Sequence, residues 1–169
     1  MYAIVKDGAI TATASTVQKL FPNTSFPSVP NTDFLTENNV KDVVHGEVKN
    51  RLYYFVTEGN IELVDGVPTQ KYTNTAKDLN DVTENGVTTP GLKTIKTEEV
   101  KDSAGQLLAK TDWMVIRKYE RDVAIPSATA TYRAAVITEC GRLESAIAGA
   151  GDVDALEAVM AAQNWPKES

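Results

Sequence analysis

The stretch that decides the fold of this chain is LLAKTDWMVIRKYERDVAIPSATATYR, residues 107–133. Thr111 or Asp112 is a suitable N-cap, and an acidic group there would lie at the positive end of a helix. We therefore expect a helix from this point to about residue 122. Pro126 cannot continue that helix, because it lacks an N–H and its ring clashes with the preceding turn. Ser127 or Thr129 can cap a second helix, so the stretch predicts a helical hairpin.

The second helix is predicted to run to about residue 148 with one apolar face. Its apolar residues recur every three or four positions: Tyr132, Val136, Cys140, Leu143 and Ile147. Asp152 can cap a third, short helix. The apolar stripe of this third helix is Val153, Leu156, Val159 and Met160. Residues 107–169 thus predict a helical hairpin or a three-helix module.

Residues 1–106 show no sustained helical period and are expected to form a β-rich region. Asp7-Gly8 separates two short runs and predicts a hairpin turn. Strands are expected at 51–57 and 61–64, with a turn at 58–60 between them. Residues 65–92 are polar and are expected to be a long irregular connection. The predicted fold class is α+β, an N-terminal antiparallel β-rich region followed by the helical module.

A proline-rich segment interrupts the predicted β region at residues 21–35, FPNTSFPSVPNTDFL. Prolines deny main-chain donors and favour extended loop, so no regular element is expected there. Phe21 and Phe26 are expected to pack beneath this loop.

Trp113 permits two interpretations. In a helix, Trp113 and Arg117 are neighbours on one face, and Glu120 lies three residues further on. Burial of the indole would outweigh any exposed ion pair, which favours Trp113, Ile116 and Tyr132 as the packing between the two helices. The alternative is a surface for a protein partner, for which the candidate residues are Trp113, Arg117, Arg121 and Arg133.

Candidate catalytic and metal-binding residues are few. The chain has one histidine, His45, and one cysteine, Cys140, which lies on an apolar stripe. Residues 78–86, DLNDVTENG, resemble a calcium loop only in part, because Val82 falls where an oxygen ligand is needed. Glu98 and Glu99 are adjacent and are interpreted as surface charge. We therefore expect no catalytic residue, no metal site and no cofactor.

Charge and hydropathy limit the possible partners. The formal net charge of −6 gives no overall attraction to phosphate backbones or anionic lipid. No run of residues reaches the roughly 18 apolar positions of a membrane span, and MYAIVKDG does not resemble a signal peptide. A single cysteine permits no intrachain disulfide. We expect a cytoplasmic site of synthesis, no nucleic-acid partner and no membrane partner.

Residues 107–166 resemble the C-terminal module of phage tail assembly chaperone and tail-fibre assembly proteins. The matching positions are Leu107, Leu108, Thr111, Asp112, Trp113, Arg117, Glu120, Pro126, Tyr132, Arg133, Trp165 and Pro166. The interval between Tyr132 and Trp165 is longer than in the family pattern. Residues 45–106 lie outside the resemblance, and the start of the chain is similar to small phage tail proteins in style only.

The resemblance implies a bacteriophage tail protein that binds tail-fibre or baseplate components. The expected role is an adaptor that stays in the virion tail, in several copies within a symmetric assembly, after synthesis and assembly in the bacterial cytoplasm. One alternative is an assembly chaperone that dissociates afterwards. A remote alternative is a small tail-associated hydrolase, which would need paired carboxylates or a site around His45.

Overall fold

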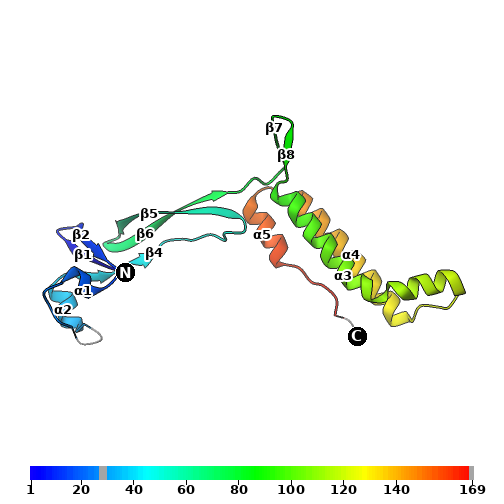
Figure 1. The fold of residues 1–169 in the computed structure, drawn as a ribbon, viewed down its shortest axis with the longest axis horizontal. Coiled ribbons are helices and arrows are strands. Elements are labelled where there is room, and N and C mark those ends of the chain that lie inside the picture. Colours follow the sequence, from blue (N-terminus) through cyan, green and yellow to red (C-terminus); the bar gives the residue numbers. More distant parts are fainter. Residues whose placement is uncertain (27–29, 168–169) are drawn as a thin grey trace. The chain divides into compact units, whose positions relative to one another are not determined.

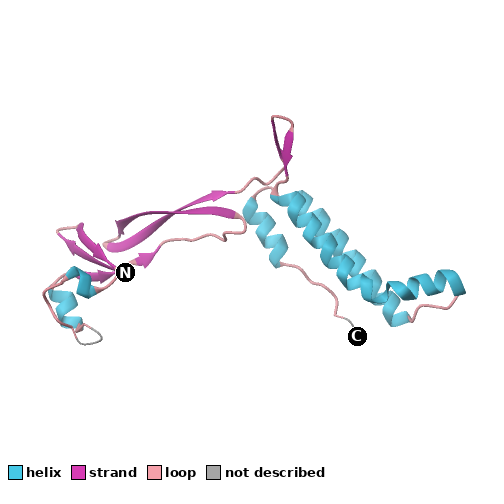
Figure 2. Cartoon of the chain, viewed as in Figure 1, coloured by secondary structure: helices cyan, strands magenta, loops and turns pink. Residues whose placement is uncertain are grey.

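The computed structural model describes residues 1–26 and 30–167 and has an α+β fold, with strands in the N-terminal part and helices in the C-terminal part (Figures 1 and 2). The chain divides into two compact units, Met1–Thr75 and Ala76–Ser169. Each unit is described on its own below.

The first unit opens with the predicted hairpin, which is confirmed. Strands β1 (Tyr2–Lys6) and β2 (Ala9–Ala14) pair antiparallel, and β3 (Val40–Asp42) pairs with the other edge of β1. The turn residues Asp7 and Gly8 have φ of 52° and 74°. Both tolerate positive φ, which a tight hairpin turn of this kind requires.

The segment 21–35, which was expected to be loop, follows one short helix directly and overlaps a second at its end. Thr16 caps α1 (Val17–Leu20) and Asn31 caps α2 (Thr32–Glu37), each by accepting a main-chain N–H. Phe21 and Phe26 pack edge-on against Phe34 of α2, with ring centroids 5.1 Å and 4.9 Å away. The middle of the predicted loop, residues 27–29, lies outside the described residues.

The second sheet of this unit has the order β4-β6-β5, formed by β4 (Val44–His45), β5 (Tyr54–Val64) and β6 (Val67–Ala76). β4 pairs with β6 in parallel, unlike the antiparallel pairs of the first sheet. The predicted turn at 58–60 is wrong, because these residues continue β5 without a break. Gly59 suits this position, since a Cβ there would meet the Lys71 carbonyl oxygen at 3.4 Å. The chain turns instead at Asp65-Gly66, with φ of 51° and 76°.

The second unit begins with a small hairpin of β7 (Val82–Glu84) and β8 (Val87–Thr89). Its turn is Asn85-Gly86, and the hydroxyls of Thr83 and Thr88 lie 2.9 Å apart across the strands. The expectation of an irregular connection over 65–92 is therefore wrong. Most of this polar stretch forms β6 and the β7–β8 hairpin, whose alternating threonines favour extended structure.

Helix α3 (Leu92–Arg121) starts much earlier than predicted. The start expected at Thr111 or Asp112 is wrong, and residues 92–106 belong to this helix rather than to a β-rich region. The buried face of the missed part is Leu92, Lys96, Val100 and Ala104, so a lysine interrupts its apolar stripe. Gly105 also lowers the helical propensity of this part. The Asp81 carboxylate supplies the cap, accepting hydrogen bonds from Gly91 N at 2.8 Å and Thr94 Oγ1 at 2.6 Å.

Helices α4 (Ser127–Gly149) and α5 (Val153–Ala161) agree with the predicted bounds. The predicted stripe of α4 is confirmed at Tyr132, Val136, Leu143 and Ile147, which are buried, whereas Cys140 is half-buried. Asp152 caps α5 as predicted, accepting from Ala155 N at 2.7 Å. Lys93 near the start of α3 contacts Ala148 near the end of α4, and Leu108 contacts Arg133, so α3 and α4 pack antiparallel.

The last turns of α3 change direction and extend past the start of α4 (Figure 1). Together with the loop that returns to α4, they form a projection that we call the helical arm, residues 113–126. None of the described helices, this long one included, has the run of apolar residues needed to cross a bilayer.

Candidate partner-binding site

The base of the helical arm is held by Arg133 of α4. Its guanidinium donates to the Leu108 carbonyl at 2.8 Å and to Thr111 Oγ1 at 2.7 Å, and forms an ion pair with Asp112 at 2.9 Å. The Thr111 hydroxyl also donates to the Leu108 carbonyl, at 3.1 Å. In an undisturbed helix that oxygen accepts only the main-chain N–H four residues later. A side chain that hydrogen-bonds to a helix carbonyl in this way is a known cause of helix bending.

A small apolar cluster lies beside this junction. Its buried members are Ala104, Tyr132 and Val136, and the partly buried side chains against it are Leu107, Leu108, Cys140 and Trp165. The chain end is brought there by Glu139, whose carboxylate accepts Asn164 N at 2.8 Å, and by Arg142, which donates to the Ala162 carbonyl at 3.0 Å. The contact between Trp165 and α4 could not be read from the sequence, because it joins segments that are distant along the chain.

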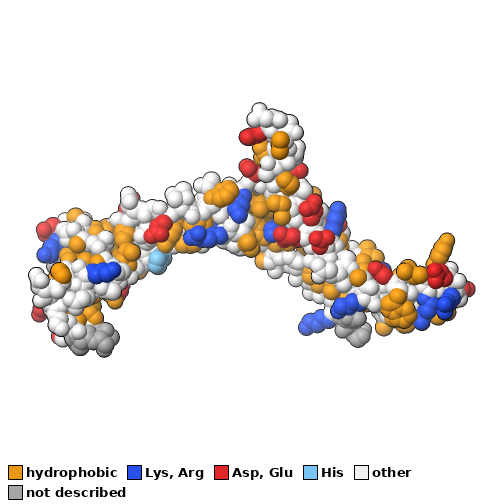
Figure 3. Space-filling model, viewed as in Figure 1, with side chains coloured by type: hydrophobic (Ala, Val, Ile, Leu, Met, Phe, Trp, Pro, Cys, Tyr) orange, Lys and Arg blue, Asp and Glu red, His pale blue; other side chains and the backbone are white. Residues whose placement is uncertain are grey.

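The helical arm itself exposes large apolar side chains. Tyr119 is 92 % exposed, Ile116 56 % and Trp113 52 %. Val115 and Val123 are also exposed, at 40 % and 41 %. Figure 3 shows hydrophobic side chains on this arm interspersed with both basic and acidic side chains. An exposed apolar group of this kind, mixed with charges, is typical of a binding surface.

The packing interpretation of Trp113 and Ile116 is therefore wrong, whereas Tyr132 is buried as expected. The face of α3 that packs on its neighbours passes through Leu92, Lys96, Val100, Ala104 and Thr111. Trp113 and Ile116 lie on a different side of the helix, because positions two and five residues after Thr111 are rotated well away from it. Packing between α3 and α4 comes from Leu107, Leu108 and Tyr132 instead.

Trp113 and Arg117 nevertheless contact each other as the spacing predicts. The Arg117 guanidinium carbon lies 4.8 Å from the centre of the Trp113 ring, which is a cation–π stack. Arg117 Nε is buried and has no hydrogen-bond partner among the described residues. The stack therefore holds a guanidinium with unused donors on the surface of the arm.

The four predicted partner-binding residues thus differ in their surroundings. Trp113, Arg117 and Arg121 belong to the helical arm, where Arg121 is exposed in the last helical turn. A cation there interacts favourably with the negative end of the helix. Arg133 is only 17 % exposed and has its guanidinium bound within the chain. The structure brings Trp113 and Arg117 into contact, leaves Arg121 exposed one turn further along the arm, and binds Arg133 within the chain at the base of the arm.

The residues considered for catalysis are not part of the helical arm, and the polar contacts of their side chains are made with residues outside it. His45 Nδ1 is 2.7 Å from the hydroxyl of Tyr72, and both side chains lie on the second sheet of the first unit. Glu99 pairs with Lys96 on α3 at 2.8 Å. Burial raises the pKa of the Cys140 thiol, and its hydrogen bond to Glu144 acts in the same direction, so little reactive thiolate forms near neutral pH. Within residues 1–26 and 30–167, no cluster of three or more His, Cys, Asp or Glu side chains could hold a metal ion.

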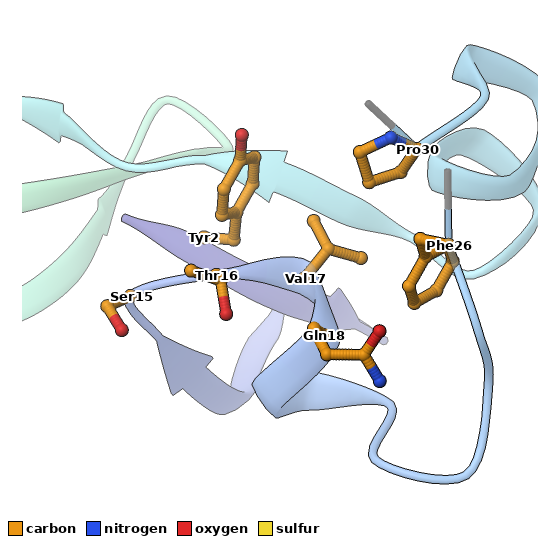
Figure 4. A pocket seen from close by; sticks show the side chains of 7 residues that line it. All are labelled: Tyr2, Ser15, Thr16, Val17, Gln18, Phe26 and Pro30. Atoms are coloured by element: carbon orange, nitrogen blue, oxygen red, sulfur yellow. The ribbon is translucent and has the colours of Figure 1, made fainter. Parts of the chain in front are cut away.

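The first unit also has a half-open pocket of about 390 Å³, which the sequence did not indicate (Figure 4). It is lined by Tyr2, Ser15, Thr16, Val17, Gln18, Phe26 and Pro30. Two of its polar groups are occupied within the chain: Thr16 caps α1, and the Gln18 amide donates to the carbonyls of Phe21 and Thr24. None of the described residues that line the pocket is an acid, a base or a histidine, so they offer no pair of groups for acid–base chemistry.

Comparisons of the chain with protein-family models, with curated proteins and with solved structures gave no match.

Proposed function

We propose that the chain is a bacteriophage tail protein that acts as an adaptor, binding a tail-fibre or baseplate component through the helical arm. The observation that carries this proposal is the exposure of Trp113, Ile116 and Tyr119 on a projecting helix end. Covering the exposed half of the Trp113 indole alone, about 100 Å², would contribute roughly 2.5 kcal/mol of gross burial energy. That is the size of a binding hot spot.

Ten of the twelve residues that carry the resemblance to tail assembly proteins, all but Pro126 and Pro166, fall into two groups according to their contacts. One group holds the helical module together: Leu107, Leu108, Thr111, Asp112, Tyr132, Arg133 and Trp165. The other group, Trp113, Arg117 and Glu120, lies on the helical arm and adds little to that packing. Because the fold does not need these three side chains, an external contact is the best physical reason for their presence in the pattern.

The adaptor is proposed to occupy equivalent positions in a symmetric tail, in three or six copies. Each copy would then present its helical arm to the same surface of the partner. The alternative, a chaperone that leaves after assembly, would use the same arm. Protein inventory of purified virions separates the two, because only the adaptor remains in the finished particle.

Two isoleucines provide a matched test. Ile116 on the helical arm is 56 % exposed and Ile137 on α4 is 59 % exposed, so Ile116→Ala and Ile137→Ala remove the same atoms at equal exposure. Purified full chain would be used to capture separately produced tail-fibre and baseplate proteins. We expect Ile116→Ala to weaken capture by about tenfold and Ile137→Ala to leave it unchanged.

Arg117→Ala with Arg121→Ala is the second variant, monitored by thermal unfolding beside wild type. Loss of capture at unchanged stability supports the helical arm as the contact. Equal capture by wild type, Ile116→Ala and the double variant would assign the contact to another surface. Failure of wild type to bind any tail component would contradict the tail-protein proposal.

A further inference from the structure

The helical arm carries three cations that the described part of the chain leaves without a carboxylate. Arg117, Lys118 and Arg121 form no side-chain hydrogen bond or ion pair with a described residue, although the chain as a whole has a net charge of −6. Other arginines are paired: Arg133 with Asp112 at 2.9 Å and Arg142 with Glu139 at 2.7 Å. The arm also carries two carboxylates, Glu120 and Asp122, so its three cations leave it with a small positive excess on an acidic protein.

The stack on Trp113 determines how Arg117 can bind a ligand. The indole covers one face of the guanidinium at 4.8 Å, and Nε is buried. The donors that remain open are the terminal N–H groups, which lie in the plane of the guanidinium and point away from its stem. Two such N–H groups match the two oxygens of one carboxylate, and the stack holds them in place before binding.

Apolar surface surrounds this donor pair. Ile116 lies beside Trp113 on the same side of the helix, three residues on, and both are more than half exposed. A ligand that reaches Arg117 therefore also covers apolar surface, which strengthens the ion pair by excluding water. A free carboxylate without an apolar neighbour would use only part of this site.

We propose that the helical arm recognises an acidic, apolar segment of its partner, with one carboxylate of that segment held by the terminal N–H groups of Arg117 and an adjacent apolar side chain against Trp113 and Ile116. The identity of the partner rests on the proposed function. The chemistry of recognition does not, and it is tested with small probes.

The experiment is solution NMR of the full chain with ¹⁵N-labelled arginine, which reports each arginine Nε–H separately. Three probes are titrated at constant ionic strength: 3-phenylpropionate, 3-phenylpropionamide and acetate. The first has a carboxylate and an apolar ring, the second lacks the charge, and the third lacks the ring. Arg117→Lys assigns the Arg117 resonance, and Arg133 and Arg142 serve as internal references because their guanidinium groups already bind carboxylates.

We expect 3-phenylpropionate to shift the Arg117 resonance with a dissociation constant at least about tenfold lower than that of either other probe, and to leave Arg133 and Arg142 in place. Trp113→Ala, checked for an unchanged circular dichroism spectrum, is expected to abolish the advantage of 3-phenylpropionate over acetate. Equal binding of the acid and the amide, equal shifts at all arginines, or no shift of Arg117 would each overturn the proposal. Selective binding of the acid without capture of any tail component would contradict the proposed function alone.

Discussion

The guanidinium of Arg133 donates a hydrogen bond of 2.8 Å to the main-chain carbonyl of Leu108, joining α4 to the middle of α3. The same guanidinium binds Thr111 and Asp112, the two residues that precede Trp113. Arg133 thereby ties α4 to the part of α3 that directly precedes the helical arm. Its contribution to partner binding would be indirect, through the position of Trp113 and Arg117.

Replacing Arg133 is expected to destabilise the fold. Arg133→Ala removes two charge-assisted hydrogen bonds and the ion pair with Asp112 between α3 and α4, so we expect a loss of about 1.5–3 kcal/mol in the free energy of unfolding. Urea denaturation followed by circular dichroism measures it. Arg121→Ala is the control, with an expected change below about 0.5 kcal/mol because the exposed Arg121 side chain makes no contact that the fold requires. Equal stability of the two variants would contradict the role given to Arg133.

Removing the hydroxyl of Tyr132, unlike replacing Arg133, is expected not to lower the stability of the fold. The ring is buried, with 8 % of the residue exposed, and the hydroxyl oxygen has no hydrogen-bond partner among the described residues. Tyr132→Phe removes this unsatisfied group and is expected to be neutral or stabilising by up to about 1 kcal/mol. Tyr132→Ala empties the cluster and should cost about 3–5 kcal/mol. A clearly destabilised Tyr132→Phe, measured in the same denaturant series, would indicate that the hydroxyl has a partner such as a bound water.

Two glycines of the second unit are expected to respond oppositely to alanine. A Cβ on Gly91, the N-cap of α3, would overlap with the main chain of Asn80, whereas a Cβ on Gly105 meets nothing within 4 Å. Gly91→Ala should therefore destabilise by about 1–3 kcal/mol. Gly105→Ala should stabilise by about 0.5–1 kcal/mol, because alanine is the better residue in a helix interior. Thermal unfolding of both variants provides the comparison. A stabilised Gly91→Ala would show that the main chain of Asn80 can shift at little cost to accommodate the added Cβ.

Glu139 is expected to make the free energy of unfolding depend on pH in the acidic range. The Arg142 guanidinium lowers the pKa of Glu139, burial opposes this, and the hydrogen bond from Asn164 N lowers it further. A carboxyl with a folded-state pKa below its unfolded value contributes stability that is complete above the unfolded pKa, about 4.3, and is lost as the pH falls through the folded value. Unfolding free energies measured between pH 7 and pH 3 should fall less steeply for Glu139→Gln than for wild type. Parallel curves would exclude a linked contribution from Glu139.

Local chemistry made much of the fold predictable. Asp7-Gly8 tolerates positive φ, Asp152 caps its own helix, and Pro126 separates α3 from α4. The apolar stripe of α4 was also readable, since four of its residues recur at helical spacing and are buried. Each of these features depends on a few neighbouring residues, so no knowledge of distant contacts was needed.

Other features could not be predicted from the local sequence, because they depend on residues that are distant along the chain. The first turns of α3 have a lysine at a buried position, and their cap comes from Asp81, ten residues before Gly91. Gly59 resembled a turn residue, but β6 lies beside it and makes it part of a long strand. In both cases tertiary contacts overrode the local preference.

The sequence by itself determined that Trp113 and Arg117 would stack, because residues four apart on a helix are neighbours whatever surrounds them. Only the tertiary structure decided that this pair lies outside the core while Tyr132 lies within it. Burial of an indole is about equally favourable in the core of a hairpin and in an interface with a partner. The residue type therefore cannot distinguish a core position from a binding position. The buried face of α3 ends at Thr111, and Arg133 of α4 binds Leu108 and Thr111 just before Trp113, so the contacts between the two helices stop short of the indole.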